Sequence, residues 1–133
     1  MSEPHGRPAA KTILVVDDRD DFRSVLKQTL ESAGYEVRAA PEGEAALELQ
    51  RNRPADLLIT DLFMPGKEGF ETITRFREQF PDTRIIAMSG GVLPGLEHDF
   101  LASAGLLGIG ATLRKPFEAD ELLATVRKVL QER

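Results

Sequence analysis

The stretch DLLITD (residues 56–61) decides the fold, because it is a short apolar run that ends on an aspartate. Two other runs are built in the same way: TILVV (residues 12–16) leads into two aspartates, and RIIAM (residues 84–88) leads into Ser89. Short, β-branched apolar runs are typical of strands that are buried on both faces of a parallel sheet. The sequence therefore predicts a sheet whose strands end on polar residues.

Two weaker strands and a series of helices complete the pattern. Residues 35–40 alternate polar with apolar side chains, which indicates an edge strand, and residues 111–114 form a short last strand. Helical spacing follows each strand, with Asp20 as the N-cap of the first helix and Phe22, Val25, Leu26 and Leu30 as its apolar stripe. The other helices are expected at residues 44–51, 69–80, 99–104 and 120–130. Five strands that alternate with five helices predict an α/β fold with helices on both faces of the sheet.

The composition is that of one acidic globular domain. The chain has 133 residues, 41% of them hydrophobic and 29% charged, and domains usually have about 100–150 residues. Residues 1–11 lack periodicity, so we expect a flexible tail before a domain at residues 12–133. The absence of cysteine excludes disulfides and thiolate chemistry.

Charge and hydropathy also limit the partners and the location. A net charge of −5 without a basic run argues against binding to nucleic acid. Nothing in the sequence resembles a membrane span or a signal peptide, which favours a cytoplasmic location away from the membrane.

Polar residues with complementary chemistry follow four of the expected strands. In open parallel sheets, binding sites form at the carboxyl ends of the strands. Three clustered carboxylates require a compensating cation, and Mg²⁺ (or Mn²⁺) prefers such oxygen ligands. Each residue alone also fits an ordinary role in a turn or on the surface, but together they predict a metal site beside a nucleophilic carboxylate. The residues are Asp17, Asp18, Asp61, Ser89 and Lys115.

Four stretches contain these residues, in the order ILVVDD (13–18), DLLITDLFMPGKEGFE (56–71), AMSGG (87–91) and GATLRKPF (110–117). This order of motifs resembles the receiver domain of two-component response regulators, including the single-domain chemotaxis regulators. The resemblance runs from about Lys11 to the C-terminus and implies a flavodoxin-like (βα)5 fold with the strand order 2-1-3-4-5. No one motif is specific, but all four in this order are.

The resemblance implies a role for each site residue. Asp61 would be the phosphoacceptor, while Asp17, Asp18, Asp61 and the backbone carbonyl of Phe63 would hold the metal ion. The hydroxyl of Ser89 would act as the switch group that moves toward the phosphoryl group. The ammonium of Lys115 would pair with a phosphoryl oxygen, with a cis peptide before Pro116.

The chain departs from the family pattern in two places. Thr112 stands where many members carry the aromatic residue that rotates during switching, so the response is expected to travel by another route. The loop at residues 90–98 is rich in glycine and longer than in compact members, which makes it a candidate for that route.

The resulting functional hypothesis is a single-domain phosphorylation switch in a two-component phosphorelay, not a turnover enzyme. A histidine kinase or histidine phosphotransfer protein would supply the phosphoryl group, and a partner protein would read the phosphorylated state. The chain would be a monomer or a phosphorylation-linked dimer. Two alternatives remain open: a Mg²⁺-dependent phosphohydrolase with an aspartate nucleophile after the first strand, and a pseudo-receiver that binds partners without being phosphorylated.

Overall fold

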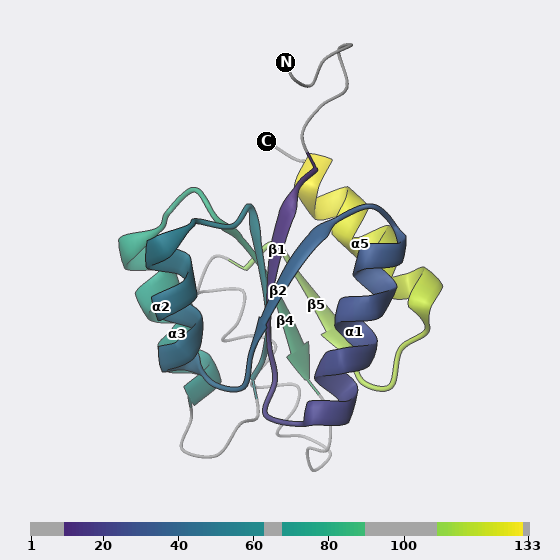
Figure 1. The fold of residues 1–133 in the computed structure, drawn as a ribbon, viewed down its shortest axis with the longest axis horizontal. Helices are drawn as coiled ribbons and strands as arrows, with labels where there is room; N and C mark the ends of the chain where they lie inside the picture. The colour runs from purple at the N-terminus through teal and green to yellow at the C-terminus, as the bar shows by residue number, and fades with distance from the viewer. Residues whose placement is uncertain (1–9, 63–67, 90–108, 132–133) are drawn as a thin grey trace.

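Figure 1 shows the fold of the chain in a computed structural model, which describes residues 10–62, 68–89 and 109–131. Five parallel strands form a sheet in the order β2-β1-β3-β4-β5, as the resemblance implied. The strands are β1 (Thr12–Val16), β2 (Glu36–Ala40), β3 (Leu57–Asp61), β4 (Arg84–Ser89) and β5 (Ala111–Arg114).

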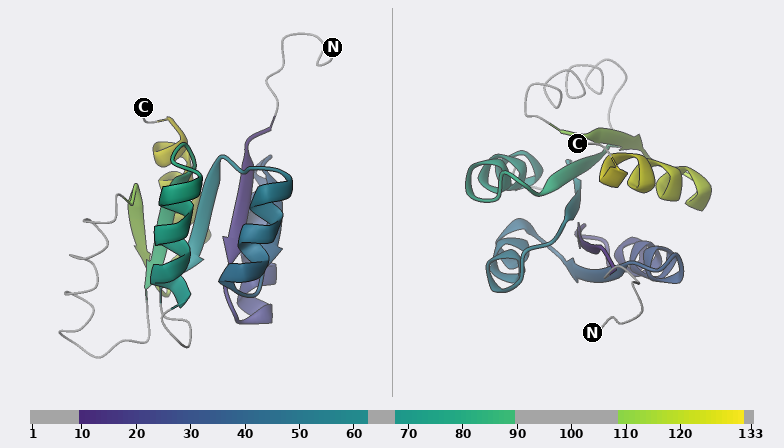
Figure 2. Two further views of the ribbon diagram at one scale, coloured as in Figure 1. Left: turned by 90° about the vertical axis from the view of Figure 1, so that its left-hand side faces the viewer. Right: turned by 90° about the horizontal axis from the view of Figure 1, so that it is seen from above.

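Helices cover both faces of this sheet (Figures 1 and 2). They are α1 (Asp20–Ser32), α2 (Gly43–Asn52), α3 (Glu68–Gln79) and α5 (Ala119–Gln131). Helices α1 and α5 pack on one face, and α2 and α3 on the other. The helix expected at residues 99–104 and most of the expected tail lie outside the described residues. No helix in the described ranges combines the length and the apolar character that a membrane crossing requires.

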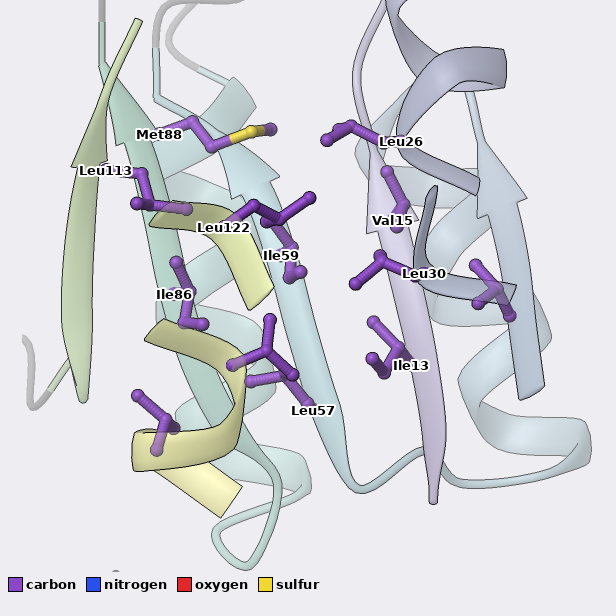
Figure 3. Close-up of a cluster of buried hydrophobic side chains, with 13 residues drawn as sticks. Ile13, Val15, Leu26, Leu30, Leu57, Ile59, Ile86, Met88, Leu113 and Leu122 are labelled. Atoms are coloured by element: carbon purple, nitrogen blue, oxygen red, sulfur yellow. The ribbon is translucent and has the colours of Figure 1, made fainter. Parts of the chain in front are cut away.

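Successive residues of the inner strands face opposite layers of helices, which explains their continuous apolar runs. Ile13 and Val15 belong to the core cluster under α1 and α5, whereas Leu14 and Val16 belong to the cluster under α2 and α3. All four side chains are fully buried. Figure 3 shows the first cluster, in which Leu30 of α1 lies over the strands. The odd-numbered residues of β1 and β3 therefore face α1 and α5.

The two weaker strands lie at the edges of the sheet, as predicted for residues 35–40. The polar positions of β2 are used for local contacts rather than for the core. The guanidinium of Arg38 donates hydrogen bonds to the carbonyl oxygens of Leu49 and Arg53 at the end of α2. The Arg38 side chain therefore adds to the hydrogen bonds at the C-terminal end of α2, where the carbonyl oxygen of Leu49 also accepts the backbone N–H of Arg53.

Two predictions about α1 are wrong. Asp20 is the first residue of the helix rather than its N-cap, which is Arg19, and Arg19 makes no side-chain capping bond. Asp20 instead pairs with Arg23 across the first turn. Val25 was expected in the buried stripe but is 58% exposed. The helix lies on the sheet along the Leu26–Leu30 line, and Val25 falls to one side of it.

A buried polar network lies at the amino ends of β3 and β4. The amide nitrogen of Gln50 donates to the Thr83 hydroxyl at 2.9 Å, and its carbonyl oxygen accepts the backbone N–H of Ala55 at 3.0 Å. The Thr83 hydroxyl in turn donates to the carbonyl oxygen of Ala55 at 2.9 Å. The network is therefore closed and uncharged, and it joins α2 to the segments that precede both strands.

Candidate functional site

The carboxyl ends of the strands bring the predicted residues together at one edge of the sheet. Asp17 directly follows β1, Asp61 is the last residue of β3, and Lys115 directly follows β5. Asp17 and Asp61 continue the odd-numbered positions of β1 and β3 that face α1 and α5, and Lys115 continues that of the buried Leu113. The alternation of side chains that builds the core therefore also places Asp17, Asp61 and Lys115 on the same face of the sheet.

Lys115 joins the two buried aspartates. Its ammonium nitrogen lies 3.0 Å from Oδ2 of Asp17 and 3.1 Å from Oδ2 of Asp61. The side chain of Asp17 is fully buried, that of Asp61 is 8% exposed, and that of Lys115 is 20% exposed. Because this site is shielded from water, the charges interact more strongly than the same groups would on an open surface.

A third carboxylate completes the acidic cluster. Asp17, Asp18 and Asp61 each offer a carboxylate oxygen, and these oxygens all lie within 4.8 Å of one another. Oxygens on opposite sides of an octahedral Mg²⁺ ion are about 4 Å apart. Lys115 neutralises one of the three formal negative charges and leaves two. The donor chemistry, the spacing and the residual charge all fit a divalent cation.

The turn between β1 and α1 holds Asp17 in place. Oδ1 of Asp17 accepts the backbone N–H of Arg19 at 2.8 Å, and the guanidinium of Arg23 donates to the carbonyl oxygen of Asp17 at 2.7 Å. Arg23 was not among the site residues predicted from the sequence. A signal was present, because a cation in the first turn of a helix opposes the helix dipole and suggests a tertiary contact.

Ser89 lies next to Asp61 in the sheet. The register pairs Asp61 with Met88, and Ser89 follows as the fully buried last residue of β4. The carbonyl oxygen of Ser89 accepts the backbone N–H of Lys115 at 2.6 Å, so the end of β4 supports the lysine. The Lys115–Pro116 peptide bond is cis, as the resemblance implied. Phe63, the remaining predicted ligand, lies outside the described residues.

Gly69 allows α3 to approach the end of β3. A Cβ atom at this position would lie 2.7 Å from Cα of Leu62 and closer still to the carbonyl oxygen of Asp61. Any larger residue would push the helix or the Asp61 backbone away. This role of Gly69 was not predicted from the sequence, because the close approach depends on how α3 lies against the sheet.

Thr112, the first departure from the family pattern, is exposed in β5 and pairs with Ala87 of β4. The second departure, the loop at residues 90–98, lies outside the described residues.

Comparison with known proteins identifies the class of protein. The family described as response regulator receiver domain matches residues 13–127. The chain belongs to this family. It is 34% identical to the response regulator receiver protein CpdR of Brucella abortus, over 90% of this chain and 97% of that protein. It is 38% identical to the transcriptional regulatory protein CpxR of Escherichia coli, over 90% of this chain but 49% of that protein.

Solved structures agree on the fold. A response regulator from Thermotoga maritima matches 92% of this chain and 99% of its own length, with a TM-score of 0.82 and 30% identity. The chemotaxis protein CheY4 of Vibrio cholerae matches with a TM-score of 0.78 and 32% identity, over 91% of this chain and 99% of its own. Several relatives are longer, and the chain spans about a quarter of the length of the transcriptional regulator NtrC of Azospirillum brasilense, to which it is 35% identical over 92% of this chain.

Proposed function

We propose that this receiver domain accepts a phosphoryl group on Asp61 in the presence of Mg²⁺ and thereby changes its binding to a partner protein. One observation carries the proposal. The carboxylate of Asp61 lies at the end of β3, in contact with the ammonium of Lys115 and close to the carboxylates of Asp17 and Asp18. A nucleophile is thus placed beside one fixed cation and a set of ligands suited to a second.

The chemistry is a simple displacement at phosphorus. A carboxylate oxygen of Asp61 forms a bond to phosphorus while the bond between phosphorus and the donor's imidazole nitrogen breaks. The electron pair of that bond leaves with the nitrogen. The product is an acyl phosphate on Asp61 and a free histidine on the donor.

Asp17, Asp18 and Asp61 would hold the metal ion, with the Phe63 carbonyl as a further ligand. A bound Mg²⁺ would neutralise charge on the oxygens of the transferring group. Lys115 would supply a second positive charge from the carboxyl end of β5, and the hydroxyl of Ser89 would donate to a phosphoryl oxygen. Each of these residues lies at the carboxyl end of a strand, in the part of the chain that the structure describes, except Phe63.

The donor is proposed to be a phosphohistidine of a sensor kinase or of a histidine phosphotransfer protein. Membership of the receiver family supports this choice. The output is proposed to be a protein partner whose affinity depends on phosphorylation. The chain itself would assist its own phosphorylation and dephosphorylation without turning over an external substrate.

Labelling with acetyl phosphate tests the proposal directly. Purified protein with Mg²⁺ and acetyl phosphate is expected to gain one phosphoryl group by intact-mass spectrometry. Labelling should be lost in Asp61→Asn and in the presence of a chelator. Asp82→Asn is a matched control, because Asp82 is an exposed aspartate before β4 and should label normally.

A turnover assay with a generic phosphatase substrate, together with the labelling result, separates the alternatives. A phosphohydrolase that uses Asp17 would turn over its substrate in Asp61→Asn but not in Asp17→Asn. The structure gives this alternative little support, because Asp17 is fully buried and both of its carboxylate oxygens accept hydrogen bonds. A wild-type protein that takes no label would instead indicate a pseudo-receiver. Label on Asp61→Asn would contradict the assignment of the acceptor.

A further inference from the structure

The ammonium of Lys115 has a third neighbour besides the two aspartates. It lies over the ring of Phe22, with Nζ 4.3 Å from the ring centroid. A lysine ammonium within about 6 Å of an aromatic face is attracted to it, and more strongly where water is excluded. The low exposure of the Lys115 side chain, 20%, favours such a contact.

The ring of Phe22 is itself held in place. Phe22 lies in the first turn of α1, is half-buried, and packs against the core cluster under α1 and α5. The ring of Phe117 meets it edge-on, with centroids 5.9 Å apart and an interplanar angle of 73°. The next residue, Arg23, ties the same turn to the carbonyl oxygen of Asp17. The ring is therefore a fixed surface beside the acidic cluster.

This surface gives Lys115 a contact that does not depend on the charges of the aspartates. A free lysine side chain samples many rotamers, and fixing it costs conformational entropy. A cation that is already in place stabilises charge on a transferring group without that cost.

We propose that Phe22 is a positioning residue that holds the Lys115 ammonium beside the carboxylate of Asp61. This inference rests on the proposed phosphorylation of Asp61. Phe22 acts through Lys115, to which its ring is in contact. Replacing the ring should therefore slow phosphoryl transfer, while a different aromatic ring should preserve it.

The test compares Phe22→Leu with Phe22→Tyr. In metal-free protein, the ring should shift the NMR signals of the Lys115 side-chain methylene groups upfield. That shift should vanish in Phe22→Leu and persist in Phe22→Tyr. The initial rate of labelling by acetyl phosphate should fall roughly three- to tenfold in Phe22→Leu, the size expected from one cation–π contact. It should stay near the wild-type rate in Phe22→Tyr.

Further variants distinguish positioning from general damage. Val25→Ala changes an exposed residue of the same helix and should leave rate and shift unchanged. If Phe22→Leu does not fold, Phe22→Met serves as the ringless variant that keeps a long apolar side chain. Phe117→Leu removes the edge-on partner and should give a smaller change in the same direction.

Epistasis provides the decisive comparison. In a Lys115→Ala background that still labels slowly, adding Phe22→Leu should cause no further loss. If Phe22→Leu slowed labelling equally in the wild-type and the Lys115→Ala backgrounds, the inference would be wrong. A Phe22→Leu protein with the wild-type labelling rate and an unchanged Lys115 spectrum would also overturn it. Failure of the wild-type protein to take label would reject the proposed function instead, which is a different result.

Discussion

Two polar clusters lie at opposite ends of the same sheet, and they differ in how their polar atoms are satisfied. At the amino end, Gln50, Thr83 and the backbone of Ala55 form a closed set of neutral hydrogen bonds. At the carboxyl end, three carboxylates cluster together, and one ammonium pairs with two of them. Figure 1 shows the two ends of the sheet, and the parallel strands run from the amino end to the carboxyl end.

The comparison teaches where function resides in this fold. A buried group whose partners all come from the protein needs nothing further and contributes to stability. A largely buried cluster with surplus negative charge, here two buried aspartates beside the exposed Asp18, is a cost to the folded chain that a ligand can relieve. The first cluster holds α2 to the sheet, and the second is the proposed cation site. The predictions below test this division.

Breaking the amino-end network should have the largest effect. Gln50→Leu leaves the buried N–H of Ala55 without its acceptor and removes the bond to Thr83, at a cost of about 3 kcal/mol in the free energy of unfolding. Urea denaturation measures this loss. Gln28→Leu, the same change at an exposed site of α1, should shift stability by less than about 0.5 kcal/mol. A similar cost at both sites would contradict the structural role of the network.

Filling the carboxyl-end site should stabilise the protein. Mg²⁺ at about a hundred times its dissociation constant should raise the free energy of unfolding by about 2.7 kcal/mol, since the ion binds the folded site. Thermal unfolding with Mg²⁺ and with chelator measures the gain. Asp61→Asn should gain less from the metal, and its metal-free form should be no less stable than wild type because repulsion falls. An equal gain in both proteins would place the ion elsewhere.

Gly69→Ala should affect both stability and labelling. The added methyl group collides with the backbone of Asp61 and Leu62, so we expect a loss of about 2 kcal/mol together with slower labelling. Gly34→Ala is the contrasting variant, because Gly34 has a φ of 99° and open space around it. It should cost about 1 kcal/mol through backbone conformation alone and label normally. Normal labelling in a folded Gly69→Ala protein would contradict the steric role.

Removing the hydrogen bond from Arg23 to the carbonyl oxygen of Asp17 should have the smallest effect on the free energy of unfolding. Arg23→Met keeps much of the side-chain stem but loses the hydrogen bond to the carbonyl oxygen of Asp17, at a cost of about 1 kcal/mol. Its metal affinity should fall slightly because the turn that carries Asp17 loosens. Isothermal titration with Mg²⁺ measures the affinity, and Arg127→Met on the exposed side of α5 is the control.

The sequence was sufficient for the sheet and for the residues at its carboxyl end. Short apolar runs identify buried strands, and parallel strands bring their carboxyl ends to one edge, so the meeting of Asp17, Asp61 and Lys115 followed from order alone. Ser89 was placed at this edge by the same rule. Nothing in that reasoning required knowledge of how the helices pack.

The details that were predicted wrongly, or not predicted at all, depend on helix placement. The exposure of Val25 follows from the line along which α1 crosses the sheet, and local spacing does not determine that line. The contact of Phe22 with Lys115 joins residues far apart in the chain, and the apolar stripe of α1 explained Phe22 without it. The close approach at Gly69 is likewise a tertiary distance. Periodicity predicts which face of a helix or strand is buried, but not which residues of other elements contact that face.

The alternation of side chains along β1 and β3 places core residues and site residues on the same face of the sheet, so the register of a strand determines the position of both. Val15 and Asp17, like Ile59 and Asp61, belong to one face of the sheet, so a slip of a strand by one residue would misplace both members of each pair together. Misassembled molecules would lose their reactive carboxylate at the same step at which they expose their apolar residues. Under the proposed function, the fraction of molecules that take the phosphoryl label would therefore measure the fraction whose sheet has the correct strand register.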